Sequence, residues 1–91
     1  MVNYVIKFSS YAEKDKKKLK QAGLENKARA LLKIVSENPF QNPPPYEKLR
    51  GDYLRCLSRR INIQHRLVYE VNEELKEIHV LRMWSHYERL R

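Results

Sequence analysis

The chain has 91 residues and a formal net charge of +8, with 33% charged and 42% hydrophobic residues. This length fits a single domain, which we assign to residues 1–91, and the composition excludes a disordered chain. The positive charge favours an anionic partner, which can be a nucleic acid, an anionic membrane surface or an acidic protein. The single cysteine, Cys56, excludes an internal disulfide, and residues 1–8 contain neither a signal peptide nor a membrane span. We therefore expect a cytoplasmic protein.

The first 22 residues predict a strand followed by a helix. Residues 2–8 place apolar side chains at every second position, which is typical of a strand. Ser9 or Ser10 then caps a helix, and Ser10 together with Glu13 has the form of a capping box. Gly23 ends this helix. The apolar residues expected to anchor it are Tyr11, Ala12, Leu19 and Ala22.

A second helix and a proline-rich loop follow. Apolar residues recur at helical spacing over residues 24–37, and Pro39 ends the pattern. The short connection at Gly23 makes the two helices antiparallel neighbours. The segment 40–45 (FQNPPP) predicts a rigid loop that delivers residues 46–49 in an extended conformation.

The second half of the chain predicts three strands, over residues 53–61, 65–72 and 77–84. The resulting order is β-α-α-β-β-β. We therefore expect an α+β fold in which two antiparallel helices pack on one face of a mainly antiparallel sheet.

Arg66 is expected on the sheet face that the helices leave open. Along its strand, Leu67 and Tyr69 point to one side and Arg66 to the other. If the apolar side chains pack under the helices, Arg66 faces a concave, basic site on the opposite side. In the free protein we expect Arg66 to form a cross-strand ion pair, with Glu47 or Glu70 as its partner.

Other reactive side chains are assigned structural roles. We interpret His65 as a structural residue at the start of a strand, and His79 as a packing or surface residue. Cys56 is expected to be a small buried apolar group. Met83 and Trp84 are expected in the core or at a dimer interface. The lysines between residues 14 and 20 form either a solvated helix face or a surface that contacts nucleic-acid phosphates.

Four stretches together resemble a known family. They are 45–49 (PYEKL), 58–61 (SRRI), 65–69 (HRLVY) and 85–87 (SHY). The sequence resembles the Txe/YoeB toxins of the RelE superfamily over nearly its whole length. This resemblance implies a RelE-like fold.

The resemblance also implies an activity and partners. The toxins of this family are ribosome-dependent, metal-independent endoribonucleases that cleave mRNA in the ribosomal A site. The implied partners are a cognate antitoxin and the 70S ribosome with its mRNA, whereas operator DNA is contacted only through the antitoxin complex. A homodimer is left open, and no membrane partner is implied.

The resemblance assigns roles to individual positions. The implied catalytic residues are Glu47, Arg66, His86 and Tyr87. The implied RNA-binding residues are Lys48, Arg50, Arg59 and Arg60. The sequence departs from the family in its tail, because residues 88–91 extend beyond the His-Tyr pair that often ends these toxins.

The chemistry of these side chains fits cleavage of RNA by its own 2′-hydroxyl. Glu47 is ionised at pH 7 and fits a general base, and His86 can hold a proton and fits a general acid. Arg66 can grip the phosphate with two donors, and Tyr87 can stack on a base. No metal or cofactor is expected, because the sequence lacks a cysteine pair, a His-x3-His spacing and a glycine-rich loop.

Two other functions remain open from the sequence. The first is a non-catalytic, basic RNA-binding or ribosome-binding module of the same fold. The second is a protein-binding module whose ligand is an acidic, antitoxin-like peptide.

Overall fold

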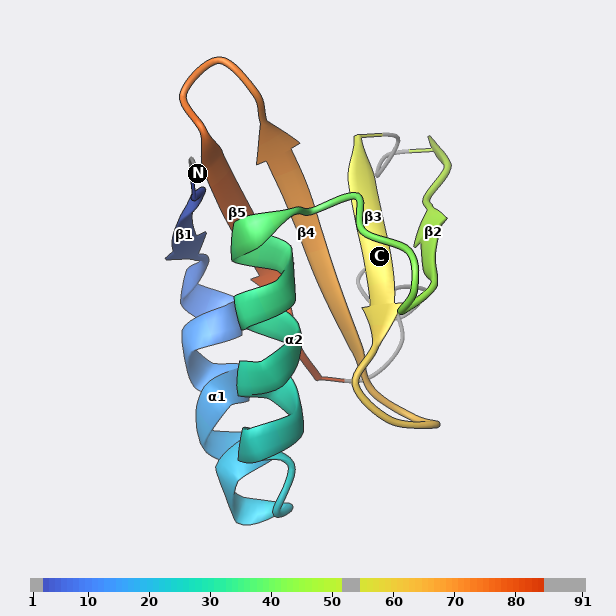
Figure 1. Cartoon of the computed structure of the whole chain (residues 1–91). Coiled ribbons are helices and arrows are strands. Elements are labelled where there is room, and N and C mark those ends of the chain that lie inside the picture. The colour runs from blue at the N-terminus through green and yellow to red at the C-terminus, as the bar shows by residue number, and fades with distance from the viewer. Residues whose placement is uncertain (1–2, 52–54, 85–91) are drawn as a thin grey trace.

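The computed structural model describes residues 3–51 and 55–84 of the chain (Figure 1). Its elements, in chain order, are β1 (Val5–Phe8), α1 (Ser10–Gln21), α2 (Glu25–Glu37), β2 (Tyr46–Lys48), β3 (Cys56–Arg60), β4 (Arg66–Asn72) and β5 (Glu77–Arg82). The two helices lie side by side on one face of the sheet (Figure 1). The predicted α+β class is confirmed. None of the helices in the described ranges is long and apolar enough to cross a membrane.

The sheet has five strands in the order β1-β5-β4-β3-β2, one strand more than the sequence predicts. β1 pairs in parallel with β5, and the other neighbours are antiparallel. The extra strand is β2, whose residues were expected as an extended segment after the prolines. It is only three residues long, so alternation of side chains is too brief to be recognised in the sequence.

The core lies between the helices and the sheet, as the alternation predicts. Leu67 and Tyr69 are fully buried in one cluster with Leu19 and Val35 from the helices. Val68 points to the other face, where it packs in a smaller cluster with two buried neighbours, Leu49 and Cys56. The expectation that Cys56 is a small buried group is confirmed.

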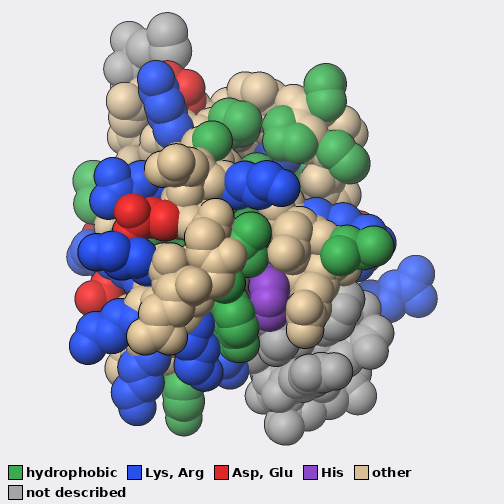
Figure 2. Space-filling model, turned by 90° about the horizontal axis from the view of Figure 1, so that it is seen from below, with side chains coloured by type: hydrophobic (Ala, Val, Ile, Leu, Met, Phe, Trp, Pro, Cys, Tyr) green, Lys and Arg blue, Asp and Glu red, His purple; other side chains and the backbone are tan. Residues whose placement is uncertain are grey.

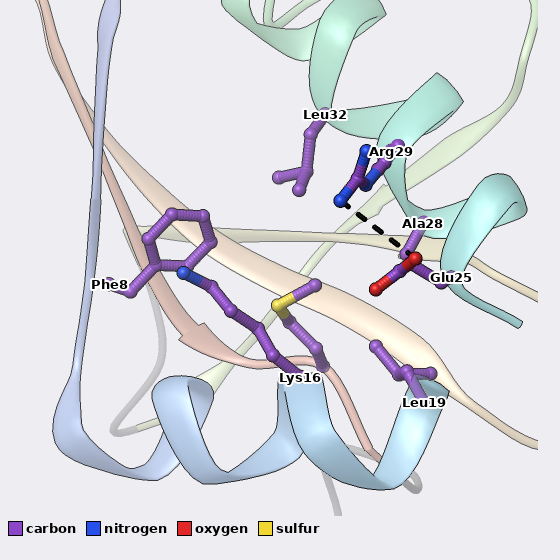
Figure 3. A pocket seen from close by; sticks show the side chains of 8 residues that line it. Phe8, Lys16, Leu19, Glu25, Ala28, Arg29 and Leu32 are labelled. Carbon is purple, nitrogen blue, oxygen red and sulfur yellow. Dashed lines mark ion pairs between the residues drawn. The ribbon is translucent and has the colours of Figure 1, made fainter. Parts of the chain in front are cut away.

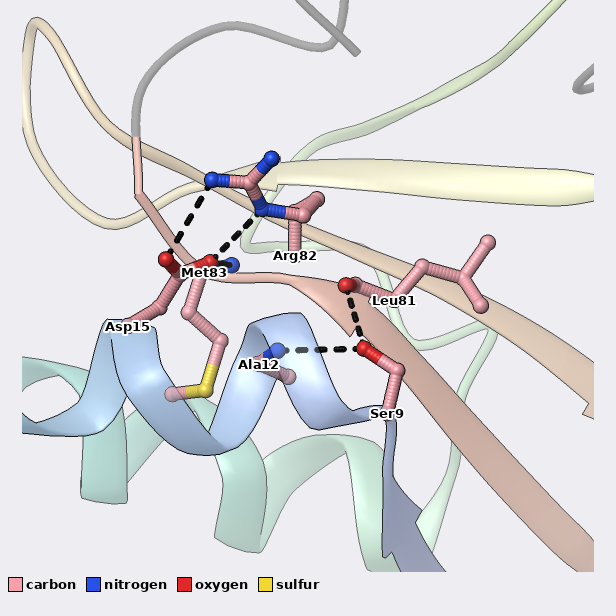
Figure 4. A network of polar contacts seen from close by, with 6 residues as sticks. All are labelled: Ser9, Ala12, Asp15, Leu81, Arg82 and Met83. Carbon is pink, nitrogen blue, oxygen red and sulfur yellow. Dashed lines mark hydrogen bonds and ion pairs between the residues drawn. The ribbon is translucent and has the colours of Figure 1, made fainter.

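The start of α1 is tied directly to β5. Ser9 is the residue that caps the helix: its Oγ accepts a hydrogen bond from the backbone N–H of Ala12 at 3.0 Å. The same hydroxyl donates to the backbone carbonyl of Leu81 at 2.7 Å (Figure 4). The capping box expected at Ser10 is not formed, because Ser10 is already the first residue of the helix. One hydroxyl therefore serves both the helix and the sheet.

A buried carboxylate forms a second link between α1 and the end of β5. Asp15 is 1% exposed, and its Oδ2 accepts hydrogen bonds from Arg82 Nε and from the backbone N–H of Met83, both at 2.9 Å (Figure 4). Tyr11, which was expected to anchor the helix, is instead 62% exposed. The thinly apolar helix is thus held partly by a polar contact, which offsets the cost of burying the charge.

We predict that Asp15→Ala lowers the free energy of unfolding by about 3 kcal/mol, because it leaves Arg82 and the Met83 N–H without their acceptor. The matched control is Glu13→Ala on the same helix. The Glu13 side chain is exposed and forms a surface ion pair with Lys16, so its loss should cost less than about 1 kcal/mol. Urea unfolding of both variants measures the difference, and equal losses would contradict the prediction.

Candidate functional site

A hollow of about 110 Å³ lies on the open face of the sheet, across β2, β3 and β4. Its lining includes Pro45, Glu47, Ser58, Arg60 and Arg66. The strand register explains this grouping, because Glu47 is paired with Ser58 and Arg60 is paired with Arg66. Cross-strand partners share a face, so these four side chains gather on one side. A concave, basic site on the open face was expected from the sequence, and the structure contains one.

Glu47 and Arg66 form an ion pair within this hollow. Glu47 Oε1 lies 3.2 Å from Arg66 Nη1, and the two side chains come from β2 and β4, with β3 between them. The expected cross-strand ion pair is therefore confirmed, with Glu47 as the partner. The Arg66 side chain is 10% exposed and the Glu47 side chain 58% exposed, so the carboxylate is the partner with freedom to move.

Arg59 does not lie at the site surface. It is 1% exposed, and its Nε donates to the hydroxyl of Tyr69 at 2.9 Å. Its remaining hydrogen bonds go to the backbone carbonyls of Pro39, Gln41 and Pro44. The prediction that Arg59 contacts RNA is therefore contradicted. Side chains alternate along β3, so the second arginine of the SRRI segment faces the hollow while the first is directed into the interior.

The buried guanidinium organises the proline-rich loop. Three prolines in a row have no backbone N–H, so the loop has few backbone donors for its own carbonyls. Arg59 supplies the missing donors, and Tyr69 adds one more by donating to the Pro39 carbonyl at 2.7 Å. Burial raises the pKa of the Tyr69 hydroxyl, so the hydroxyl remains protonated and able to donate. The loop that leads into Glu47 is thereby fixed to β3 and β4.

The other predicted RNA-binding side chains are accessible. Lys48, Arg50 and Arg60 are exposed, and Arg60 lines the hollow. Further cations lie on α1, where Lys14, Lys17, Lys18 and Lys20 are exposed. Figure 2 shows Lys and Arg side chains gathered over the side of the molecule that carries the helices. The positive surface thus extends well beyond the hollow.

His86 and Tyr87 lie outside the described residues. The last described residue is Trp84, whose ring stacks on His65 with a centroid distance of 3.8 Å and an interplanar angle of 20°. His65 is 4% exposed and directly precedes Arg66. The structural role expected for His65 is confirmed. Trp84 therefore lies next to the start of β4.

A second hollow, of about 240 Å³, lies between the helices and β1 (Figure 3). Phe8, Leu19 and Leu32 supply apolar walls, and the Nζ of Lys16 lies 3.5 Å from the centre of the Phe8 ring. Its carboxylate, Glu25, is 3.8 Å from Arg29 of the same helix. The lining is mainly apolar and lacks the cross-strand acid–cation pair of the first hollow, so we place the candidate site at Glu47 and Arg66.

The comparisons with known proteins identify the family of the chain. The sequence profile described as "YoeB-like toxin of bacterial type II toxin-antitoxin system" matches residues 5–87. The chain belongs to the YoeB-like toxin family. It is also 32% identical to a protein named Toxin YoeB from Synechocystis sp., over 87% of this chain and 83% of that protein. The chain is therefore a toxin of a type II toxin–antitoxin system.

Solved structures of YoeB-like toxins have the same fold. A YoeB/ParE toxin from Agrobacterium tumefaciens superposes with a TM-score of 0.83 at 26% identity, covering 91% of this chain and 99% of that one. A YoeB-YefM complex from Staphylococcus aureus gives a TM-score of 0.77 at 33% identity, covering 92% and 98%. The RelE-like architecture expected from the sequence is confirmed.

The SRRI segment of this YoeB-like toxin offers a direct test of the buried arginine. We predict that Arg59→Ala lowers the free energy of unfolding by about 3 kcal/mol, because three carbonyls and Tyr69 lose their donor. The neighbouring Arg60→Ala should change it by less than about 0.5 kcal/mol, since that side chain is exposed. Chemical denaturation of the two variants gives the comparison, and a similar loss for both would refute the structural role of Arg59.

Proposed function

We propose that this YoeB-like toxin is a ribosome-dependent, metal-independent endoribonuclease that cleaves mRNA in the ribosomal A site and so inhibits translation. The observation that carries the proposal is the 3.2 Å contact between Glu47 and Arg66 in the hollow on the open sheet face. A carboxylate beside a guanidinium supplies a proton acceptor and an anion-binding cation. Both are needed to cleave a phosphodiester without a metal.

The proposed reaction uses the RNA's own 2′-hydroxyl as the nucleophile. Glu47 accepts the proton of this hydroxyl while the 2′-oxygen attacks phosphorus. Arg66 donates to the non-bridging oxygens and stabilises the charge that develops on them. His86 gives a proton to the leaving 5′-oxygen, and Tyr87 stacks on a base or hydrogen-bonds the scissile group. The products are a 2′,3′-cyclic phosphate, or the 3′-phosphate formed from it, and a 5′-hydroxyl.

The reaction requires Glu47 and Arg66 to separate. Glu47 is the exposed member of the pair and sits on the edge strand β2, so it can turn toward the 2′-hydroxyl. Arg66 is held in place by its burial and remains available for the phosphate. Opening the pair leaves the buried Arg66 without its carboxylate, and the incoming phosphate offsets that loss by taking the place of Glu47.

The C-terminal segment enters the proposed mechanism from beside Arg66. Trp84 stacks on His65, the neighbour of Arg66, and Met83 is buried and bonded through its N–H to Asp15. His86 follows Trp84 by two positions in the sequence. This anchoring supports the assignment of His86 and Tyr87 to the same site as Glu47 and Arg66.

The exposed cations supply the proposed contacts to RNA. Arg60 lines the hollow, and Lys48 and Arg50 are exposed near it in the sequence, so all three can bind phosphates of the mRNA. Arg59 is buried and binds the proline-rich loop instead. The exposed lysines of α1 would add contacts to ribosomal RNA. Affinity that depends on such contacts falls as the salt concentration rises.

The proposed partners follow from the family. The solved S. aureus relatives are a YoeB-YefM complex and a YoeB dimer. We propose that this chain is bound and inhibited by a cognate antitoxin, that it contacts operator DNA only through that complex, and that it acts in the cytoplasm. A small acidic reading frame beside its gene would support the first point.

Cell-free translation tests the nuclease directly. The wild-type chain should cleave mRNA at A-site codons in translating ribosomes and leave 5′-hydroxyl ends. Glu47→Ala or His86→Gln should reduce the cleavage rate by roughly 10²–10⁴-fold, the usual contribution of one general acid or base. Primer extension on the recovered mRNA measures the rate and the position of the cuts.

The controls are chemically matched to these variants. Glu74→Ala and His79→Gln remove an exposed carboxylate and an exposed imidazole from the β4–β5 hairpin, away from the hollow, and should cleave like the wild type. Intact mRNA and normal translation in the presence of the wild-type chain would refute the nuclease proposal. Ribosome binding that survives both active-site variants, without cleavage by any form, would favour the non-catalytic RNA-binding module instead.

The oligomeric state is a separate prediction. By analogy with the S. aureus YoeB dimer, we expect the purified chain to form a homodimer at micromolar concentration. Light scattering should then give about twice the 11.0 kDa mass of one chain. A mass of one chain across that concentration range would contradict the dimer without affecting the nuclease proposal.

A further inference from the structure

Two buried polar atoms in the hollow have no hydrogen-bond partner. Within residues 3–51 and 55–84, Ser58 Oγ and Arg66 Nε are the buried side-chain nitrogen or oxygen atoms that lack one. Ser58 is 1% exposed. Buried hydroxyl groups in folded proteins usually have a hydrogen-bond partner. Both residues line the same hollow. Unsatisfied groups of this kind lower stability, so their coincidence at one site points to a ligand.

The register places Ser58 at the Glu47–Arg66 ion pair. Ser58 lies opposite Glu47 across the β2–β3 ladder, and Arg66 lies opposite Arg60 across the β3–β4 ladder. Because Glu47 and Arg66 come from strands on either side of β3, their ion pair spans β3 at the level of Ser58 and Arg60. The hydroxyl therefore lies on the strand that the ion pair crosses.

The missing partner must be a hydrogen-bond acceptor. Arg66 Nε can only donate, and the Ser58 hydroxyl can donate to the same acceptor. Arg60 adds a positive charge to the lining of the hollow. An anionic oxygen satisfies all three groups, because hydrogen bonds from a guanidinium and a hydroxyl to an anion are short and strong. A phosphate oxygen fits this chemistry, whereas a metal cation does not.

We propose that Ser58 Oγ and Arg66 Nε form an oxyanion subsite that binds a phosphate oxygen when Glu47 releases Arg66. In the free protein, Glu47 occupies Arg66 Nη1 and keeps the subsite closed. Binding of a phosphate is a property of the subsite itself, whereas the assignment of that phosphate to the scissile group of RNA rests on the proposed function. Ser58 then contacts the substrate directly and holds the phosphate in line with Arg66.

The test uses inorganic phosphate and the full chain. In Glu47→Gln, where Arg66 has lost its carboxylate, phosphate should bind more tightly than to the wild type and should shift the Nε–Hε NMR resonance of Arg66, identified by its loss in Arg66→Lys. Adding Ser58→Ala should weaken phosphate binding about tenfold, the typical effect of losing one hydrogen bond to a charged group. An unchanged affinity in the double variant would overturn the subsite.

Cys56→Ala is the matched control for Ser58→Ala. Cys56 lies two residues earlier on the same strand and face, is also buried, and loses one heavy atom in the same way. Burial, with a smaller effect of Glu70, raises the pKa of its thiol to about 11, so no charge is removed. Phosphate binding should be unchanged in Glu47→Gln/Cys56→Ala. An equal loss for both variants would mean that packing, not the hydroxyl, supports binding.

Two further readouts separate the subsite from a fold defect and from the nuclease proposal. Ser58→Ala should unfold at the same urea concentration as its parent or a higher one, because the hydroxyl has no partner among the described residues. A large loss of stability would overturn the proposal. In the translation assay, Ser58→Ala should lower the cleavage rate about tenfold, whereas Cys56→Ala should not. If phosphate binds in a Ser58-dependent way but the wild type cleaves no mRNA, only the nuclease proposal is refuted. If Ser58→Ala cleaves mRNA at the wild-type rate, the role of the subsite in catalysis is refuted.

Discussion

The buried guanidinium of Arg59 is the contact on which the site depends. Glu47 follows a loop that is poor in backbone donors, and nothing in the loop itself directs it toward β3. Arg59 collects the carbonyls of Pro39, Gln41 and Pro44, and it is in turn bonded to Tyr69 at the centre of the core. Among the described residues no carboxylate pairs with Arg59, and its charge is stabilised by these hydrogen bonds and by the Tyr46 ring, whose centre lies 4.9 Å from the guanidinium carbon. The loop and the core are therefore a single structural unit, and the position of Glu47 is a consequence of it.

In the free protein, two charged side chains of the candidate site, Glu47 and Arg66, pair with each other. The Glu47 carboxylate pairs with Arg66 across the intervening strand β3. The arrangement leaves the anion-binding donor Arg66 Nε and the Ser58 hydroxyl unsatisfied, which an isolated protein would not favour. A phosphate that enters the hollow can replace Glu47 as the partner of Arg66. Glu47 can then accept the proton of the 2′-hydroxyl. The resting pair is thus compatible with an acid–base site that becomes ordered by its substrate.

The sequence predicts the helical layer and the sheet of this fold, but it misses the edge strand β2 and the burial of Arg59. The alternation of Arg66, Leu67, Val68 and Tyr69 is long enough to assign faces, and the structure confirms it. The strand β2 spans three residues and carries no periodic signal. The two arginines of SRRI have the same chemistry, so only the strand register separates the buried one from the exposed one. Ser58 was not predicted for a similar reason, since its relevance arises from pairing with Glu47 across a ladder.

The same logic connects stability to function in a chain this small. A domain of this size buries only about 60% of its unfolded surface, so an apolar core cannot by itself hold four separate segments at one site. Two buried charges supplement it: Arg59 fastens the segment that leads to Glu47, and Asp15 fastens the N–H of Met83, from which the chain continues past Trp84. Each charge bonds to main-chain atoms, so each determines the path of the backbone as well as the packing. Losing either charge would both misplace a segment of the proposed site and destabilise the fold. Ser58 Oγ has no hydrogen-bond partner among the described residues, so a substitution there can change binding without changing stability.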